Sequence, residues 1–326
     1  MTDKVRFGIL GCASIAVDKV IPAMQRSERC EVVAIGSRDA SRAAAAESRL
    51  GIAISHGSYE GVLDDDAVEA VYIPLPNHLH AEWTRRAAAA GKHVLCEKPL
   101  GLGVAEVVDM IEACRAADVV LMEAFMYRLH PLWQRAHELV AGGAIGELQA
   151  IQARFTYRNV DPANIRNIAA YGGGAVMDIG CYPINVARWF FGGEPTTVTA
   201  AVRRDPTFGT DVLTSAVLDF DGRQASFVCS TQLEPDQRVH LLGTTGRLEV
   251  EIPFNIPPDR PTRLVLAAGG EPPVAPGLSV FEIPTCDPYT AEADAFAQAV
   301  REGLPAPVPP DDAIGNMRVI ERILAS

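Results

Sequence analysis

Short runs of aliphatic and β-branched residues alternate with alanine-rich stretches of helical period over the first 123 residues. The runs predict strands at 5–10, 31–37, 70–73, 93–97 and 119–122. The stretches between them predict helices near 15–26, 40–50, 79–90 and 104–117. Strands that alternate with helices form βαβ units around a parallel sheet. The sequence therefore predicts an N-terminal Rossmann domain, a doubly wound α/β fold.

The pattern changes beyond about residue 125. One amphipathic helix is predicted at 131–141, and strand-like runs follow at 149–157, 197–203, 215–220 and 225–231. A proline-rich stretch at 252–276 interrupts them, and apolar helices are predicted at 289–302 and 311–324. We expect two domains, 1–123 and 124–326, the second an α/β domain with a mostly antiparallel sheet.

Composition narrows the class of protein. The 326 residues suit two domains, and 48% hydrophobic with 21% charged residues is typical of a globular protein. A net charge of −12 with only four lysines argues against a nucleic-acid partner. The seven cysteines contain no C-x-x-C pair, so we expect reduced thiols, no metal site and a cytoplasmic location. No stretch has the roughly 20 apolar residues of a membrane span.

A glycine turn joins the first predicted strand to the first helix, in Gly8-Ile-Leu-Gly11-Cys-Ala-Ser. Glycine permits a tight turn and lets backbone N–H groups approach a pyrophosphate at a helix N-terminus. The motif alone is weak, because any strand-to-helix turn can contain glycine; its place as the first βα turn makes it informative. The candidate cofactor contacts here are Gly8, Gly11, Ala13, Ser14 and Ile15.

The end of the second predicted strand reads Ile-Gly-Ser37-Arg38-Asp39. Enzymes that use NAD usually have an acidic residue here, whereas Ser37, Arg38 and Arg42 suit a 2′-phosphate. We therefore expect NADP, with NAD still possible because Asp39 is close. The alternative is that Ser37 or Asp39 caps the next helix and the arginines are solvated.

Two further polar segments follow predicted strands, at the edge where open α/β sheets bind ligands. Pro74, Asn77 and His80 are candidate cofactor contacts in the first, although either polar side chain could instead satisfy the loop backbone. Glu97 and Lys98 lie in the second, before Pro99. A lysine there can hydrogen-bond a ribose and a substrate hydroxyl and offset the charge of an alkoxide; the alternative is a solvated lysine.

The segment from Ala90 to Leu100, AGKHVLCEKPL, together with GGGAVMDIGCY from Gly172 to Tyr182, resembles the glucose-fructose oxidoreductase, inositol dehydrogenase and MocA (Gfo/Idh/MocA) family. The resemblance implies a C-terminal domain with a large open sheet whose exposed face joins subunits in a homodimer or homotetramer. It also implies catalytic roles for Lys98, Asp178 and Tyr182. The spacing agrees, since residues four apart share one helix face; the alternatives are a core tyrosine and a helix-dipole aspartate.

Several polar residues outside these motifs are candidate substrate contacts. The resemblance places 157–167 in the cleft, and its amides and arginines suit a polyol, although loops are polar anyway. The candidates are Arg128, Arg158, Asn159, Arg166, Asp178 and Tyr182. Arg128 could instead tie the domains together.

These features predict an NADP-dependent oxidoreductase that acts on a free aldose such as xylose or glucose. The alternatives are a nucleotide-linked keto-sugar reductase, a trans-dihydrodiol dehydrogenase and, outside enzymes, a non-catalytic sensor. Only a few residues precede the first predicted strand, so we expect an exchangeable cofactor rather than an enclosed one.

Overall fold

The computed structural model describes residues 4–269 and 277–326. The chain forms two compact units. The first runs to Leu129 and also contains Asp287–Ile314, and the second consists of His130–Cys286 and Gly315–Ser326. The first unit thus includes a segment that the sequence analysis assigned to the C-terminal domain.

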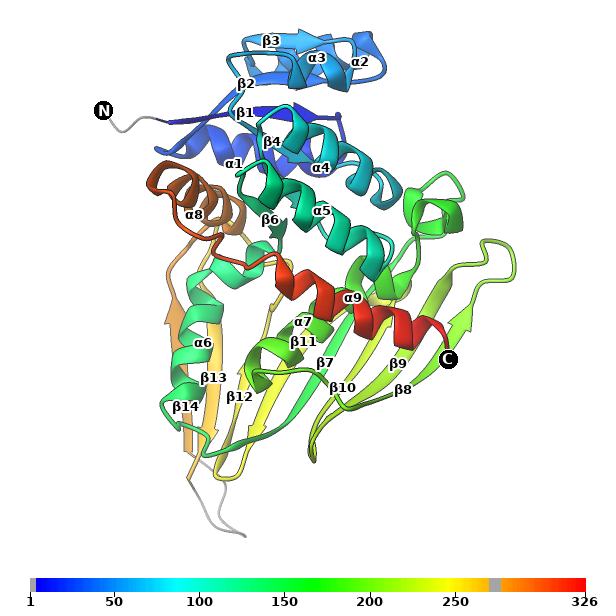
Figure 1. The fold of residues 1–326 in the computed structure, drawn as a ribbon. Coiled ribbons are helices and arrows are strands. Elements are labelled where there is room, and N and C mark those ends of the chain that lie inside the picture. The colour runs from blue at the N-terminus through cyan, green and yellow to red at the C-terminus, as the bar shows by residue number, and fades with distance from the viewer. Residues whose placement is uncertain (1–3, 270–276) are drawn as a thin grey trace. The chain divides into compact units, whose positions relative to one another are not determined.

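A parallel sheet of six strands forms the centre of the first unit, in the order β3-β2-β1-β4-β5-β6 (Figure 1). The strands are β1 (Val5–Leu10), β2 (Cys30–Gly36), β3 (Ile54–His56), β4 (Ala70–Ile73), β5 (His93–Glu97) and β6 (Leu121–Ala124). This order confirms the predicted Rossmann fold. Strand β3 was not predicted, because it has three residues and none of them is buried.

Helices cover both faces of this sheet. They are η1 (Ala16–Val20), α1 (Ile21–Arg26), α2 (Ala40–Leu50), α3 (Tyr59–Leu63), η2 (Asn77–Leu79), α4 (His80–Ala89), α5 (Val104–Ala116), η3 (Met126–Leu129) and α8 (Pro288–Glu302). Successive residues of a strand point to opposite faces. Phe7 faces α8, where its ring centroid lies 5.8 Å from that of Phe296. Gly8 faces α3, where a Cβ would overlap the side chain of Val62.

The second unit contains an eight-stranded sheet in the order β14-β13-β12-β11-β7-β10-β9-β8. The strands are β7 (Leu148–Arg158), β8 (Thr197–Arg204), β9 (Asp211–Phe220), β10 (Arg223–Ser230), β11 (Gln232–Gly243), β12 (Gly246–Val250), β13 (Thr262–Ala268) and β14 (Gly277–Ile283). The β10–β7 pair is parallel and the others are antiparallel. The mostly antiparallel sheet confirms the predicted fold class.

Helices pack on one face of this sheet. They are α6 (Pro131–Ala141), the π-helical turn η6 (Val176–Gly180), α7 (Cys181–Phe191) and, from Gly315 onward, α9 (Asp311–Leu324); the short turns η4 (Ile165–Asn167) and η5 (Ala169–Tyr171) precede η6. Aromatic rings fill the interior beneath them. Phe254 lies 5.0 Å from Phe155 of β7 and 5.1 Å from Tyr182 of α7, centroid to centroid.

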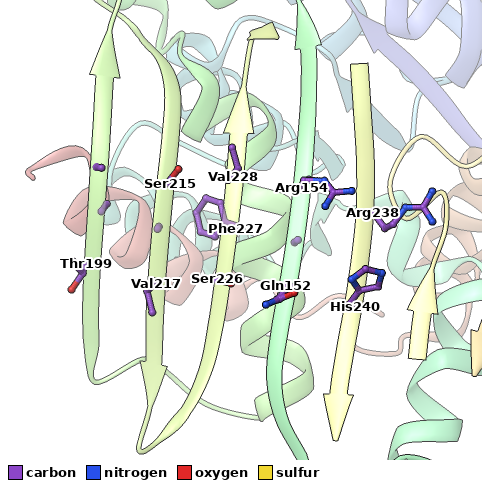
Figure 2. Close-up of a pocket in the computed structure, with 14 residues that line it drawn as sticks. Gln152, Arg154, Thr199, Ser215, Val217, Ser226, Phe227, Val228, Arg238 and His240 are labelled. Atoms are coloured by element: carbon purple, nitrogen blue, oxygen red, sulfur yellow. The ribbon is translucent and has the colours of Figure 1, made fainter. Parts of the chain in front are cut away.

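The opposite face of the sheet carries two rows of mostly small or uncharged side chains (Figure 2). One row, in register across five strands, is His240, Gln152, Ser226, Val217 and Thr199. The next row is Arg238, Arg154, Val228, Ser215 and Ala201. Their neighbours along each strand point toward the helices, as Phe155 does, so these rows form the open face of the sheet.

Among the described residues, no helix is long and apolar enough to cross a membrane.

The packing of α8 gives the first prediction. Phe296 is fully buried against Phe7, so Phe296→Ala should remove about 3–5 kcal/mol from the free energy of unfolding of the first unit. Urea unfolding followed by tryptophan fluorescence measures the change. Leu304→Ala is the control, since 46% of Leu304 is exposed in the same unit and its truncation should change stability by less than about 0.5 kcal/mol. Equal effects of the two substitutions would contradict the described packing.

Candidate active-site residues

The glycine turn after β1 has the backbone of a phosphate-binding loop. Gly11 has a φ of +115° and donates its N–H to the carbonyl of Gly36 at 2.8 Å, which joins the ends of β1 and β2. Only glycine adopts this conformation without strain. Ala13 and Ile15 are half-buried and Ser14 is exposed, immediately before the helix of η1. The turn therefore presents backbone N–H groups at a helix N-terminus, as an anion site requires.

Of the residues after β2, Ser37 and Asp39 form hydrogen bonds that build the turn, whereas Arg38 and Arg42 are exposed. Asp39 caps α2, because its Oδ1 accepts hydrogen bonds from the Ser41 N–H at 2.9 Å and the Ser41 hydroxyl at 2.6 Å. These bonds, led by that from the Ser41 hydroxyl, lower the pKa of the Asp39 carboxyl. Ser37 is buried and accepts from the Asp39 N–H. Arg38 and Arg42 are exposed, and Arg42 reaches the Cys12 carbonyl at 3.2 Å.

The capping alternative for Asp39 is thus what the structure contains. The Asp39 carboxylate is engaged by the first turn of α2, while Arg38, just after β2, and Arg42, in α2, are exposed. This arrangement suits a phosphate better than a ribose 2′-hydroxyl.

Glu97, at the end of β5, orients the backbone of Lys98. The Tyr72 hydroxyl donates to Glu97 Oε1 at 2.7 Å, and the Lys98 N–H donates to Oε2 at 3.3 Å. Tyr72 is fully buried, and burial followed by the charge of Glu97 raises its pKa. The phenol therefore stays protonated and remains a donor to Glu97.

The segment after Lys98 is held from two sides. The Lys98–Pro99 peptide bond is cis. The Leu100 N–H donates to Glu123 Oε1 at 2.9 Å, and the Pro99 carbonyl lies 2.9 Å from Nδ1 of His80. Lys98 thus lies on a loop whose backbone is fixed on both sides.

His80 acts through the loop backbone. It is fully buried, and its Nε2 lies 2.8 Å from the Leu75 carbonyl. Two carbonyl acceptors favour the charged ring, but burial is the larger effect and lowers the pKa of His80 to about 4. His80 therefore joins the loops that follow β4 and β5, so any effect on a cofactor is indirect. Pro74 is buried at the end of β4, and half-buried Asn77 opens η2.

A buried carboxyl group that the sequence analysis missed lies near Glu97. Glu292 of α8 is 1% exposed, and its Oε1 has no hydrogen-bond partner among the described residues. Burial, and then the charge of Glu97, raise the pKa of Glu292 well above its ordinary value. The raised pKa favours the neutral form of Glu292 near the carboxylate of Glu97.

Asp178 in η6 is held by two donors from its own unit. Its Oδ2 accepts from the Tyr157 hydroxyl at 2.6 Å and from Nε of Arg166 at 2.9 Å. Burial, followed by the charge of Asp178, raises the pKa of Tyr157, so this tyrosine remains a donor. Both partners stabilise the carboxylate and fix its orientation.

Tyr182 lies in the first turn of α7, four residues after Asp178. It is 6% exposed, and its ring packs against Phe155 and Phe254 at centroid distances of 5.5 and 5.1 Å. The turn between Asp178 and Tyr182 is π-helical and closes over five residues, so a spacing of four stays within one turn. The core alternative describes the packing of the Tyr182 ring, which belongs to an aromatic core at the end of the segment that carries Asp178. The catalytic role of Tyr182 stays a prediction.

The polar side chains of the segment at 159–167 form hydrogen bonds mostly with one another and with the backbone of the same segment. Asn159 Oδ1 accepts from the Asp161 N–H at 3.0 Å and from the Asn167 amide at 3.3 Å. Asn164 Oδ1 accepts from the Arg166 N–H. These bonds build the loop, so its polarity alone is weak support for a polyol site. Arg158, at the end of β7, is exposed.

Arg128 and its neighbour His130 have structural partners. Arg128 Nη1 lies 2.9 Å from Asp312 Oδ2, with both residues in the first unit. His130 Nδ1 accepts from the Leu132 N–H and so caps α6. The chain passes from the first unit to the second between Leu129 and His130. Arg128 and His130 thus each stabilise the local structure of their own unit next to that point.

Sequence reasoning missed Tyr157, Phe254 and Glu292 as parts of these sites. Tyr157 and Phe254 occur in no motif, and Glu292 lies on a helix that the sequence assigned to the other domain. Of the described residues, no group of three or more His, Cys, Asp or Glu side chains could hold a metal ion.

Comparison with known proteins identifies the family. Residues 5–125 match the family model described as "Oxidoreductase family, NAD-binding Rossmann fold", and residues 133–249 match the GFO/IDH/MocA C-terminal domain. The chain is 44% identical over 322 residues to D-xylose 1-dehydrogenase (NADP(+)) 2 of Haloferax volcanii, covering 98% of this chain and 96% of that protein.

Other relatives act on different compounds. A dTDP-3,4-didehydro-2,6-dideoxy-alpha-D-glucose 3-reductase of Streptomyces violaceoruber is 36% identical over 301 residues, covering 91% of this chain and 85% of that protein. A solved 3-ketoreductase from Actinomadura kijaniata, in complex with NADP and TDP-benzene, is 32% identical with a TM-score of 0.91, covering 99% of this chain and 98% of that one. Together with the family models, these similarities show that the chain is an oxidoreductase of the Gfo/Idh/MocA family.

Proposed function

We propose that this oxidoreductase uses NADP to interconvert a free aldose, such as xylose or glucose, and its oxidised form. The observation that carries the proposal is the pair formed by Asp178, fixed by Tyr157 and Arg166, and Tyr182 one turn later. A fixed carboxylate and a phenol on one helical segment provide an acceptor and a proton carrier for a sugar hydroxyl. The NADP-dependent xylose dehydrogenase, at 44% identity, supports this substrate class.

The first unit fits NADP. The turn at Gly8 and Gly11 with Ala13, Ser14 and Ile15 would hold the pyrophosphate, and Ser37, Arg38 and Arg42 would hold the 2′-phosphate. Pro74, Asn77, Glu97 and Lys98 follow strands at the carboxyl edge of the sheet, where the nicotinamide ribose would bind. The bound nicotinamide would supply or accept the hydride. The solved ketoreductase complex with NADP supports this choice over NAD.

The chain's own residues divide the remaining chemistry. Tyr182 exchanges the proton of the reacting hydroxyl, and Lys98 offsets the negative charge that develops on that oxygen. Asp178, held as a carboxylate, accepts a hydrogen bond from the substrate and orients it. The fixed loop around Lys98 keeps its charge in place, so little reorganisation accompanies the reaction.

A nucleotide-linked keto-sugar reductase is the second candidate. Arg158 is exposed at the end of β7, and a guanidinium group suits a diphosphate. Arg166, the other candidate, already donates to Asp178, so its charge is offset within the site. With one arginine engaged, the free aldose is favoured. A trans-dihydrodiol dehydrogenase ranks third, consistent with the 32% identity of the mouse enzyme.

The open face of the eight-stranded sheet supports a homo-oligomer, a dimer or a tetramer. Its two rows are mostly hydroxyl, amide or small apolar groups, and Val217 of β9 is 43% exposed. Arg154 and Arg238 pair with acidic side chains, so the face holds little uncompensated charge. A flat face of this kind can pack against its own copy about a two-fold axis.

All seven cysteines are free thiols, which fits the reducing cytoplasm.

Removing the Tyr182 hydroxyl tests the chemistry. Tyr182→Phe keeps the ring that packs against Phe155 and Phe254, and should lower kcat by about 10²- to 10⁴-fold. Reduced-nicotinamide absorbance, with NADP and a panel of free aldoses, measures turnover. Tyr171→Phe, with 37% of Tyr171 exposed, is the matched control and should turn over like the wild type. Unchanged turnover of Tyr182→Phe would refute the role of Tyr182, and activity only on nucleotide-linked keto-sugars would favour the second candidate.

Removing Arg38 tests cofactor choice. Hydrogen bonds to a charged group contribute roughly 1.5–3 kcal/mol, so Arg38→Ala should raise KM for NADP by about 10- to 100-fold and leave KM for NAD unchanged. Arg49→Ala is the control, because Arg49 is exposed on α2 and pairs with Asp18. An equal rise in KM for NADP and NAD would show that Arg38 does not bind the 2′-phosphate.

Placing charge on the open sheet face tests the oligomer. Val217→Arg should convert the oligomer to monomer, because like charges would meet and be desolvated across the two-fold axis. Sedimentation velocity gives the mass. Val160→Arg is the control, since Val160 is 48% exposed outside this face and its replacement should leave the mass unchanged. A wild-type protein that sediments as a monomer would contradict the proposed homo-oligomer.

A further inference from the structure

The glycine run at 172–174, just before η6, is explained by close packing within the second unit. Gly174 has a φ of +124°, a conformation that only glycine adopts readily. A Cβ on Gly174 would overlap Oδ1 of Asp211, the first residue of β9. A Cβ on Gly173 would lie 2.5 Å from the Arg166 carbonyl oxygen. The run therefore lets the chain pass close to Asp211 and to the loop that carries Arg166.

The Asp211 carboxyl group fills that space and forms a hydrogen bond with the start of η6. Its Oδ2 accepts the Val176 N–H at 2.8 Å and the Thr214 hydroxyl at 3.3 Å. Asp211 is 2% exposed, so water does not replace it as an acceptor. The residue that precedes Val176 is Ala175, which has no side-chain acceptor of its own. A carboxyl group from a neighbouring strand thus caps the helical segment that its own sequence leaves uncapped.

The segment η6 also packs closely against strand β10. A Cβ on Gly180, at the end of η6, would lie 3.1 Å from Sγ of Cys229 in β10, so η6 lies closely against the sheet. The Ser230 hydroxyl of β10 donates to the Val212 carbonyl at 2.6 Å, which joins β10 to the start of β9 beside Asp211. Asp178 follows Val176 by two residues, and its N–H donates to the Gly174 carbonyl at 3.1 Å. The position of Asp178 therefore depends directly on the capped turn.

We propose that Asp211 is a positioning residue for catalysis: by holding the first turn of η6 against β9, it sets the position of Asp178 and Tyr182. This inference rests on the proposed roles of those two residues. Asp211 touches neither substrate nor cofactor in this account and acts on η6 through its hydrogen bond with the Val176 N–H. Because a displacement of about 1 Å can cost 10²-fold in rate, loss of this bond affects kcat more than binding of NADP.

The test compares Asp211→Ala with Asp211→Asn. Asp211→Ala should lower kcat by about 10- to 100-fold, with KM for NADP unchanged. Asp211→Asn keeps the shape and one oxygen acceptor, and should retain at least about a third of the wild-type kcat. Asp205→Ala is the matched control: Asp205 also accepts backbone N–H groups, from Thr207 and Phe208, but in the turn between β8 and β9. Asp205→Ala should keep the wild-type kcat.

Hydrogen exchange separates this inference from the proposed function. Measured by mass spectrometry on the full chain, exchange at 175–182 should rise in Asp211→Ala and stay at the wild-type level in Asp211→Asn and Asp205→Ala. If no aldose is turned over by the wild type, the proposed function fails and the exchange result still tests the cap. Wild-type exchange and kcat in Asp211→Ala, or equal damage in Asp211→Asn, would overturn the role of Asp211.

Discussion

Backbone groups removed from water need hydrogen-bond partners, and this requirement determines where the chemistry-bearing side chains of each unit lie. After β5 the chain leaves the sheet, and the groups around Pro99 no longer have a neighbouring strand. Glu123 accepts the Leu100 N–H, and His80 lies against the Pro99 carbonyl. In the second unit the Val176 N–H meets the same need with Asp211. Lys98 and Asp178 are thus located by partners distant in sequence.

Patterning along the chain predicted most strands and helices because most of them bury a regular face. Strands β1, β4 and β5 and helices α2, α6 and α9 have the predicted bounds, since continuous apolar runs or clear helical periods define them. Strands β11 to β14 were not predicted. Only two of the twelve residues of β11 are buried, and β13 lies within the proline-rich stretch. Their order depends on pairing with neighbours, which a local pattern does not encode.

The packing partners of an element were harder to predict than the element itself. A helix near α8 was predicted, but it packs in the first unit, where Phe296 contacts Phe7 and Glu292 is buried near Glu97. The same limit applies to the site. Motifs located Lys98 and Asp178, whereas Tyr157, which holds Asp178, has no signature because its role arises only from the fold.

The surroundings of Asp178 and Tyr182 suggest how their roles divide. Asp178 accepts from both a phenol and a guanidinium group, which stabilises a carboxylate and makes it a better acceptor than proton donor. The Tyr182 ring lies among the aromatic side chains of Phe155 and Phe254. A tyrosine in that setting exchanges its proton readily only where a cation compensates the phenolate. In the proposed mechanism Lys98 provides such a cation. The proposed mechanism therefore assigns the proton transfer to Tyr182 and the orientation of the substrate to Asp178.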